Sequence, residues 1–222
     1  MNQGAGGVTV RDFDELVDMA VAFNFLPSET SRDLGVQGGS GGSSVNAADL
    51  LEEAGLNLVR IPQDIRDQLK AEGFSEHDWF NNPIDGSISM GDSSPTARLT
   101  ELMLEHDDFK TFVASPLGGM GPGGPPGKLN GRSHGNGGNF DVDIEAMLEH
   151  SLHRRTKKPV IMLGGDMPKM PGMEEMANAF EQIRDRTIKE GVATFPTMTR
   201  AAAALGKLTD FYDYRRKLAE YS

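Results

Sequence analysis

Residues 34–49, Leu-Gly-Val-Gln-Gly-Gly-Ser-Gly-Gly-Ser-Ser-Val-Asn-Ala-Ala-Asp, decide the fold of this chain. The first four residues predict a short strand, the glycines and serines after them a tight turn, and the remainder a helix. Glycines permit a sharp turn and let a ligand come close to the main chain. A helix that begins after such a turn directs free N–H groups and a partial positive charge at that ligand. The stretch therefore predicts an α/β unit with a site for phosphate or another anion.

The same alternation of strand and helix continues along the chain. Five apolar strands separated by helices are typical of a parallel sheet that is covered on both faces. With right-handed crossovers, we expect a flavodoxin-like, doubly wound α/β/α sandwich with strand order 2-1-3-4-5. The predicted strands are residues 34–37, 56–61, 111–114, 159–163 and 192–195, and the predicted helices are residues 12–23, 44–54, 62–72, 95–106, 141–153, 173–190 and 197–220.

The first predicted helix is amphipathic, and Asp12 or Thr9 could cap its N-terminus. Gly55 is placed to end the second helix, and Thr197 to cap the last one. The apolar residues of the first helix recur at helical spacing and are Phe13, Leu16, Val17, Ala20 and Val21.

The expected sheet places the ligand site at the carboxyl ends of its strands, where the strand order reverses. Under order 2-1-3-4-5 this point lies between the first and third strands. The first strand ends in the glycine turn, the third in Ser115-Pro-Leu-Gly-Gly119, and the fourth in Gly164-Gly-Asp166. Ser115 is therefore expected beside the glycine turn.

The glycine turn differs from two well-known phosphate-binding loops. No Lys-Ser or Lys-Thr pair follows it, so it is not a Walker loop. Ser44 occupies the last position of the pattern Gly39-x-Gly41-x-x-Ser44, so it is not a clean dinucleotide fingerprint either. A turn that serves packing alone remains the alternative interpretation.

Composition excludes several classes of function. The chain has 222 residues, a formal net charge of −11 and no cysteine. The negative charge argues against nonspecific binding to nucleic acid or anionic membranes. Without cysteine there are no disulfides and no thiolate sites. No apolar run approaches the length of a membrane span, and residues 1–7 are small and polar, typical of a linker. We expect one cytoplasmic domain over residues 1–222.

The remaining reactive side chains favour structural interpretations. His134 lies in a glycine-rich segment, residues 118–139, that is long for a structureless loop inside a domain. His150 and His153 lie three apart on a predicted helix but lack a third metal ligand. His77 adjoins Trp79, which suits packing or a partner surface. We therefore expect no metal site and no catalytic residue in this chain, and we expect methionines 162, 167, 170, 173 and 176 to serve packing.

Several pieces of the chain, in order, resemble one known family. Residues 8–20, Val-Thr-Val-Arg-Asp-Phe-Asp-Glu-Leu-Val-Asp-Met-Ala, are similar to its opening helix, and residues 34–56 to its glycine turn and helix. Asn82-Pro-Ile-Asp85 resembles its Asn-Pro-(Val/Ile)-Asp element. Residues 158–165, and residues 191–196 followed by 200–205, resemble its closing strands. The family is the NDP-forming acyl-CoA synthetases, related to succinyl-CoA synthetase, and the resemblance is to their flavodoxin-like ligase domain over residues 8–212.

This resemblance implies a role for the glycine turn. In the family a phosphohistidine carries phosphoryl from acyl phosphate to nucleotide, and helix N-termini help to hold the phosphate. Asn82 and Asp85 would lie adjacent to that site. The residues implied to face the phosphate are Gly38, Gly39, Ser40, Gly41, Gly42 and Ser43.

The chain also departs from the family pattern. The family's phosphorylated histidine belongs to a Ser-His-Thr-Gly-Ala segment that this sequence lacks, and His134 lies elsewhere. The CoA-binding and ATP-grasp domains are missing as well. The resemblance thus implies one part of a hetero-oligomeric acyl-CoA ligase, with CoA and ATP bound by partner domains or subunits. A non-catalytic binding or regulatory module, and an accessory subunit of another acyl-CoA-handling complex, are the alternatives.

Overall fold

The computed structural model describes residues 7–37, 41–74, 80–85, 95–114, 158–165 and 174–220. Within these ranges the chain forms a five-stranded parallel sheet in the order β2-β1-β3-β4-β5. This result confirms the predicted fold class and strand order. The strands are β1 (Asp33–Gln37), β2 (Asn57–Leu58), β3 (Thr111–Ala114), β4 (Val160–Leu163) and β5 (Ala193–Phe195).

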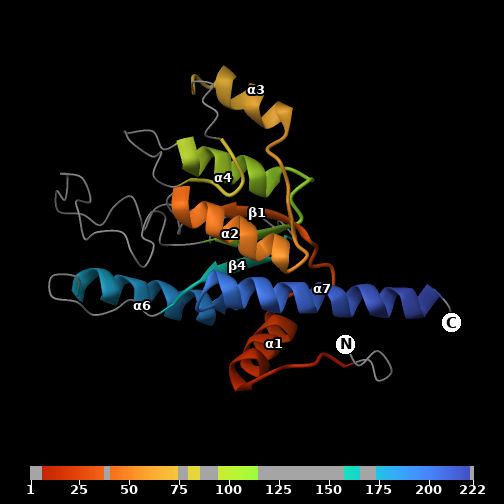
Figure 1. The fold of residues 1–222 in the computed structure, drawn as a ribbon. Helices are drawn as coiled ribbons and strands as arrows, with labels where there is room; N and C mark the ends of the chain where they lie inside the picture. The colour runs from red at the N-terminus through yellow and green to blue at the C-terminus, as the bar shows by residue number, and fades with distance from the viewer. Residues whose placement is uncertain are drawn as a thin grey trace.

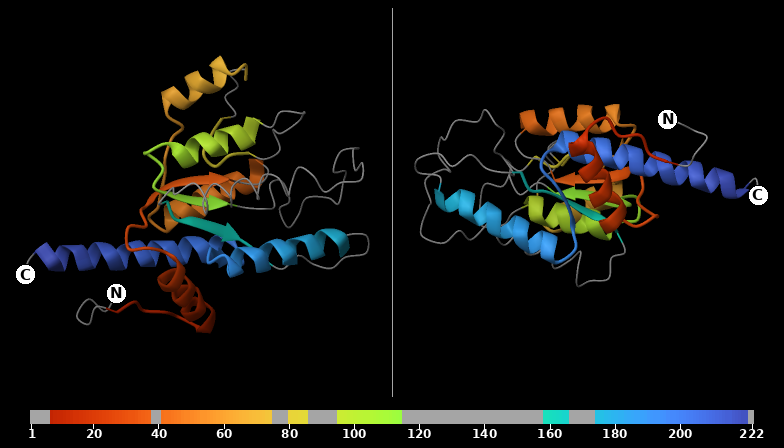
Figure 2. Two further views of the ribbon diagram at one scale, coloured as in Figure 1. Left: turned by 180° about the vertical axis from the view of Figure 1, so that it is seen from behind. Right: turned by 90° about the horizontal axis from the view of Figure 1, so that it is seen from below.

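Helices cover both faces of the sheet (Figures 1 and 2). One face carries α1 (Phe13–Phe25), α2 (Gly41–Glu53) and the long α7 (Met198–Glu220), and the other carries α4 (Pro95–Glu105) and α6 (Glu174–Lys189), with α3 (Gln63–Ala71) packed against α4. The predicted helix over residues 141–153 and the segment 118–139 lie outside the described residues.

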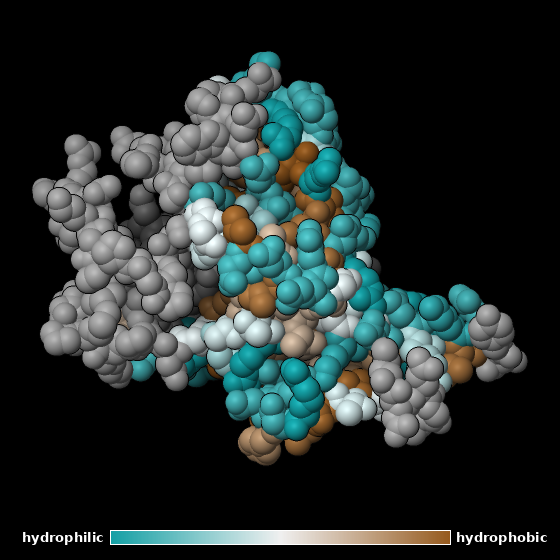
Figure 3. All heavy atoms as spheres, in the orientation of Figure 1, coloured by the Kyte–Doolittle hydropathy of each residue, from teal (hydrophilic) through white to brown (hydrophobic). Residues whose placement is uncertain are grey.

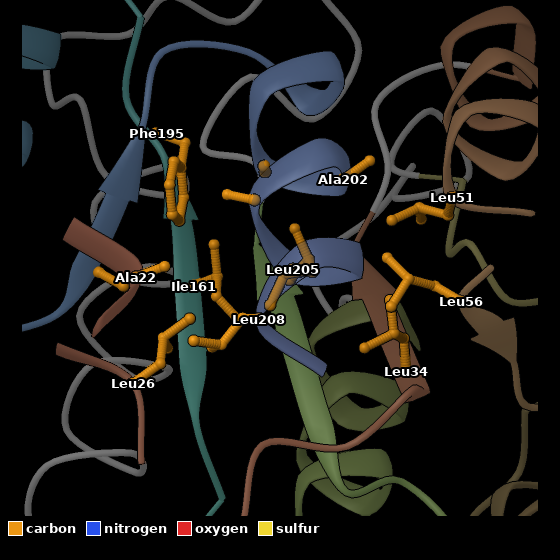
Figure 4. Close-up of a cluster of buried hydrophobic side chains, with 14 of the residues drawn as sticks. Ala22, Leu26, Leu34, Leu51, Leu56, Ile161, Phe195, Ala202, Leu205 and Leu208 are labelled. Carbon is orange, nitrogen blue, oxygen red and sulfur yellow. The ribbon is translucent and has the colours of Figure 1, made fainter. Parts of the chain in front are cut away.

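The core consists of two apolar layers, one on each face of the sheet. Successive side chains of a strand point to opposite faces, so β3 contributes Phe112 to one layer and Val113 to the other. In the layer beneath α7, strand residues such as Ile161 meet Leu205 and Leu208 of that helix (Figure 4). This alternation explains why the strands read as nearly continuous apolar runs.

A glycine lets α7 lie close to α2. A Cβ at residue 206 would come within 2.6 Å of the carbonyl oxygen of Ala54, just after the end of α2. Arg32 reinforces the same junction, because its guanidinium hydrogen bonds to Asp210, Asp213 and the carbonyl oxygen of Gly55. Burial opposes the ionised form of Asp213, but the hydrogen bonds from Arg32 and Arg216 lower its pKa overall. The start of β1 is thereby fixed to α7.

Two predicted boundaries differ from the observed ones by three residues. The second helix was expected from residue 44 but begins at Gly41, because its first turn continues into the glycine segment. The second strand was expected over residues 56–61, but β2 ends at Leu58. Beyond Leu58, the segment 80–85 lies beside β1 in place of β2. There the backbone N–H of Ile84 donates to the carbonyl oxygen of Val36 at 2.8 Å.

The predicted first helix is present, and Asp12 caps it by accepting a hydrogen bond from the backbone N–H of Glu15 at 2.8 Å. An amphipathic helix usually buries its apolar side, but α1 buries Glu15 and Asp18 and leaves Phe13 76% and Leu16 51% exposed. The reason lies in α7, which presents cations to α1. Arg200 there forms two hydrogen bonds of 2.7 and 2.8 Å with the carboxylate of Asp18.

Candidate functional site at the carboxyl end of the sheet

The first and third strands end side by side, as the predicted strand order requires. Gln37, the last residue of β1, pairs with Ala114, the last residue of β3. The glycine turn follows Gln37, and Ser115 follows Ala114, so both segments leave the sheet at neighbouring points. Gly38, Gly39, Ser40 and Ser115 lie outside the described residues, so their phosphate-facing and site-adjacent roles stay predictions.

Three of the predicted phosphate-facing residues form the first turn of α2. Gly41 and Gly42 are exposed, and Ser43 is partly exposed. The first N–H groups of a helix have no acceptor within the helix, and the helix dipole places partial positive charge there. A Cβ at residue 42 would meet no atom of the described residues within 4 Å. The N-terminus of α2 therefore presents backbone N–H groups beside two exposed glycines.

Asp85 is placed at the same helix terminus. The segment that carries it runs parallel to the end of β1, where Ile84 forms a bridge with Gln37. A Cβ at residue 41 would come within 3.1 Å of Oδ2 of Asp85, so only a glycine at residue 41 leaves the carboxylate where it is. A carboxylate is stabilised next to a helix N-terminus, and it also repels any further anion that binds there.

Asn82 holds this segment against the sheet. Its side-chain oxygen accepts a hydrogen bond from the backbone N–H of Val36 at 2.8 Å. Its side-chain nitrogen donates to the carbonyl oxygens of Leu34 at 2.6 Å and Val59 at 2.9 Å. The amide thus joins β1 to the chain just after β2 and positions Asp85. The sequence pattern predicts Asn82 near the site but does not indicate this bridging role, because the partners of Asn82 lie more than twenty residues away in the chain.

The glycines after β4 serve packing at this edge. A Cβ at Gly165 would overlap the carbonyl oxygen of Pro196, and a Cβ at Gly164 would lie 3.2 Å from Cγ of Arg184. The side-chain stem of Arg184 therefore covers the end of β4 from α6. Pro196 leads into α7, whose cap is Thr197 as predicted: its hydroxyl oxygen accepts a hydrogen bond from the backbone N–H of Arg200 at 3.2 Å.

The described residues place the N-terminus of α2 at this edge but no set of catalytic or metal-binding side chains. No group of three or more His, Asp or Glu residues within the described ranges could hold a metal ion. His106, which sequence analysis did not single out, lies at the opposite end of the sheet, before β3, and its Nε2 is 3.1 Å from Oδ2 of Asp64. His77, His134, His150 and His153 lie outside the described residues. No helix in the described part of the chain has the length and apolar character needed to cross a membrane.

Comparison with solved structures shows the same fold within longer chains. The chain is similar to dinucleotide-forming acetyl-coenzyme A synthetase 1 of Ca. Korarchaeum cryptofilum in complex with phosphate and ADP, with a TM-score of 0.65, 18% identity, 99% of this chain and 41% of that chain covered. The apo form of the same protein gives a TM-score of 0.63 and 17% identity, and the match covers 99% of this chain and 42% of that chain. PH0766 from Pyrococcus horikoshii OT3 gives a TM-score of 0.60 and 19% identity, and the match covers 94% of this chain and 42% of that chain.

The chain therefore spans about two-fifths of the length of these structures. No family model matches the sequence, and no curated protein matches it. At identities below one fifth, what the comparisons establish is a shared fold. The fold of this chain is thus similar to that of part of a dinucleotide-forming acetyl-coenzyme A synthetase.

Proposed function

We propose that this chain is a domain or subunit of an NDP-forming acyl-CoA ligase, which converts an acid, CoA and a nucleoside triphosphate into acyl-CoA, nucleoside diphosphate and phosphate. The observation that carries the proposal is the exposed N-terminus of α2 at the carboxyl end of the sheet, in a fold that the chain shares with part of an acetyl-coenzyme A synthetase. The similar solved structure of an acetyl-coenzyme A synthetase with bound phosphate and ADP supports the same class of ligand.

In this proposal the chain binds phosphate and does not itself transfer it. The N–H groups of Gly41, Gly42 and Ser43 hold the phosphate oxygens, and the partial charge of α2 stabilises the negative charge that gathers during phosphoryl transfer. Asn82 fixes the segment that borders the site. The phosphohistidine and the sites for CoA and nucleotide belong to partner domains or subunits, which accords with a chain that spans only part of the similar structures.

The decisive experiment is a reconstitution. The chain is combined with the CoA-binding and ATP-grasp polypeptides of the same organism, and thioester formation from acetate, CoA and ATP is measured. We expect no turnover by the chain alone and turnover by the combination. Combinations that bind the chain but form no thioester would contradict the ligase role and favour a regulatory module.

A pair of variants tests whether phosphate binds at the N-terminus of α2. Gly42→Asp adds a negative charge that a helix N-terminus tolerates well, yet it repels phosphate. Gln63→Asp makes a similar change at the N-terminus of α3 and serves as the control. We expect thioester formation to fall at least about tenfold in the first variant, the effect of losing about 1.4 kcal/mol of phosphate stabilisation, and to be unchanged in the second. Equal activity of the two variants would contradict a phosphate site at α2.

A further inference from the structure

One buried hydroxyl near the N-terminus of α2 makes no hydrogen bond. Ser44 is only 8% exposed, and its Oγ has no hydrogen-bond partner in the part of the chain that the structure describes. Among the described residues the one other buried oxygen of this kind, Oε1 of Glu15, is ion-paired with Lys207. A hydroxyl that is buried without a partner lowers the stability of the fold. Its position at Ser44 therefore points to a partner that the chain itself does not supply.

The Ser44 hydroxyl is directed at the first turn of α2. Ser44 is the first buried residue of this helix, and the Cα–Cβ bonds of a helix tilt toward its N-terminus. A buried hydroxyl within a helix often donates to the carbonyl oxygen four residues earlier, as Thr100 of α4 does to Thr96 at 2.8 Å. Figure 3 shows a surface of intermediate hydropathy where α2 begins, as expected of glycine and serine. Ser44 thus adds an O–H donor to the backbone N–H groups of residues 41–43.

The same turn also faces a hydrogen-bond acceptor. Oδ2 of Asp85 lies 3.1 Å from the position that a Cβ on residue 41 would take. Asp85 already interacts within the chain, but an ionised carboxylate offers about four acceptor positions and no donor. An anion that binds beside it is repelled least if one of its own oxygens carries a proton and donates that proton to the carboxylate. The first turn of α2 therefore combines several donors with one acceptor.

We infer that the N-terminus of α2 selects free phosphate that carries a proton. The N–H groups of residues 41–43 and the Ser44 hydroxyl donate to its ionised oxygens, and Asp85 accepts the hydrogen bond from its P–O–H group. This inference rests on the proposed function and names the form of the anion at that site. Inorganic phosphate keeps a proton at neutral pH, whereas sulfate, of nearly the same shape, keeps none. Sulfate would set a bare oxygen against the Asp85 carboxylate, and such a repulsive contact produces specificity.

Separate titrations of the ¹⁵N-labelled chain with sodium phosphate and sodium sulfate, at neutral pH and constant ionic strength, test the selectivity. The amides of residues 41–43 report both dissociation constants, and we expect phosphate to bind at least about tenfold more tightly than sulfate. In Asp85→Asn, whose amide can donate as well as accept, sulfate should gain more than phosphate, which brings the two affinities within about threefold of each other. Equal affinities in the parent, or an unchanged preference in Asp85→Asn, would overturn the inference alone. If neither anion shifts these amides, the phosphate site of the proposed function fails with it.

Ser44→Ala tests the donor. It should weaken phosphate binding about fivefold, the effect of one hydrogen bond. It should also raise the melting temperature of the free chain by about 2–4 °C, because it removes a buried hydroxyl without a partner and alanine favours a helix. Thr100→Ala is the matched control: it removes a buried hydroxyl that does have a partner, so it should lower the melting temperature and leave the phosphate affinity unchanged. A Ser44→Ala variant that binds phosphate like the parent, or that loses stability together with affinity, would overturn the role of Ser44.

Discussion

The carboxylate of Asp85 lies against Gly41 at the N-terminus of α2, so close that a Cβ on residue 41 would come within 3.1 Å of Oδ2. The two residues are 44 positions apart in the sequence and meet because the segment before Asp85 runs beside β1. The proposed phosphate site therefore already contains one negative charge. Any phosphate bound by the first turn of α2 shares the helix dipole with this carboxylate.

Asp85→Asn is expected to strengthen phosphate binding. Removing a like charge at the rim of an exposed site is worth on the order of 1 kcal/mol, or about fivefold in affinity. Isothermal titration calorimetry with inorganic phosphate measures the change. Asp49→Asn, which removes an exposed carboxylate farther along α2, is the control and should have a much smaller effect. Unchanged or weaker binding by Asp85→Asn would place the anion elsewhere.

Asn82→Asp is expected to destabilise the fold by about 3 kcal/mol. The replacement keeps the size of the side chain but sets an acceptor oxygen against the carbonyl oxygens of Leu34 and Val59. Urea denaturation measures the free energy of unfolding. Asn178→Asp, at an exposed position of α6, should stay within about 0.5 kcal/mol of the parent. If both variants unfold alike, the amide of Asn82 does not hold the sheet as described.

Gly206→Ala is expected to cost about 1–3 kcal/mol of stability, because the added methyl group meets the Ala54 carbonyl oxygen at 2.6 Å and forces α7 away from α2. Gly42→Ala makes the same change in α2, where no atom of the described part of the chain lies within 4 Å of the added Cβ. There alanine should stabilise the chain by about 0.5–1 kcal/mol through its higher helix propensity. Thermal unfolding of both variants measures the change in stability relative to the parent. If the two changes had the same sign, the close contact between α7 and α2 would be contradicted.

The contribution of Glu15 to stability is expected to depend on pH. A hydrogen bond from Lys207 lowers the pKa of Glu15 below its ordinary value of 4.5. Its stabilising effect is therefore complete above pH 4.5 and is lost as the pH falls through the lower pKa of the folded state. Glu15→Gln should cost about 1–2 kcal/mol at pH 7.

That cost should shrink as the solution is acidified below the ordinary pKa of a glutamate. Urea denaturation of Glu15→Gln and the parent at a series of pH values follows the difference in unfolding free energy. Glu52→Gln, at an exposed position of α2, is the control and should show little difference at any pH. A constant cost for Glu15→Gln at every pH would mean that the charge of Glu15 does not contribute.

The alternation of apolar strands and helices was enough to predict the sheet and its strand order. The caps Asp12 and Thr197 followed from residue type, because capping depends on neighbours within one turn. The exposure of Phe13 and Leu16 on α1 could not be predicted, since burial of Glu15 depends on Lys207, nearly two hundred residues later. The short β2 was missed for a similar reason, because the segment at Asn82 takes its place beside β1.

The most direct test of the account follows the backbone amides of a ¹⁵N-labelled chain by NMR while inorganic phosphate is added. A phosphate site at the N-terminus of α2 predicts saturable shifts of the Gly41, Gly42 and Ser43 amides, and it predicts that Gly42→Asp removes them. Saturation at another part of the chain, with these three amides unchanged, would contradict the central claim.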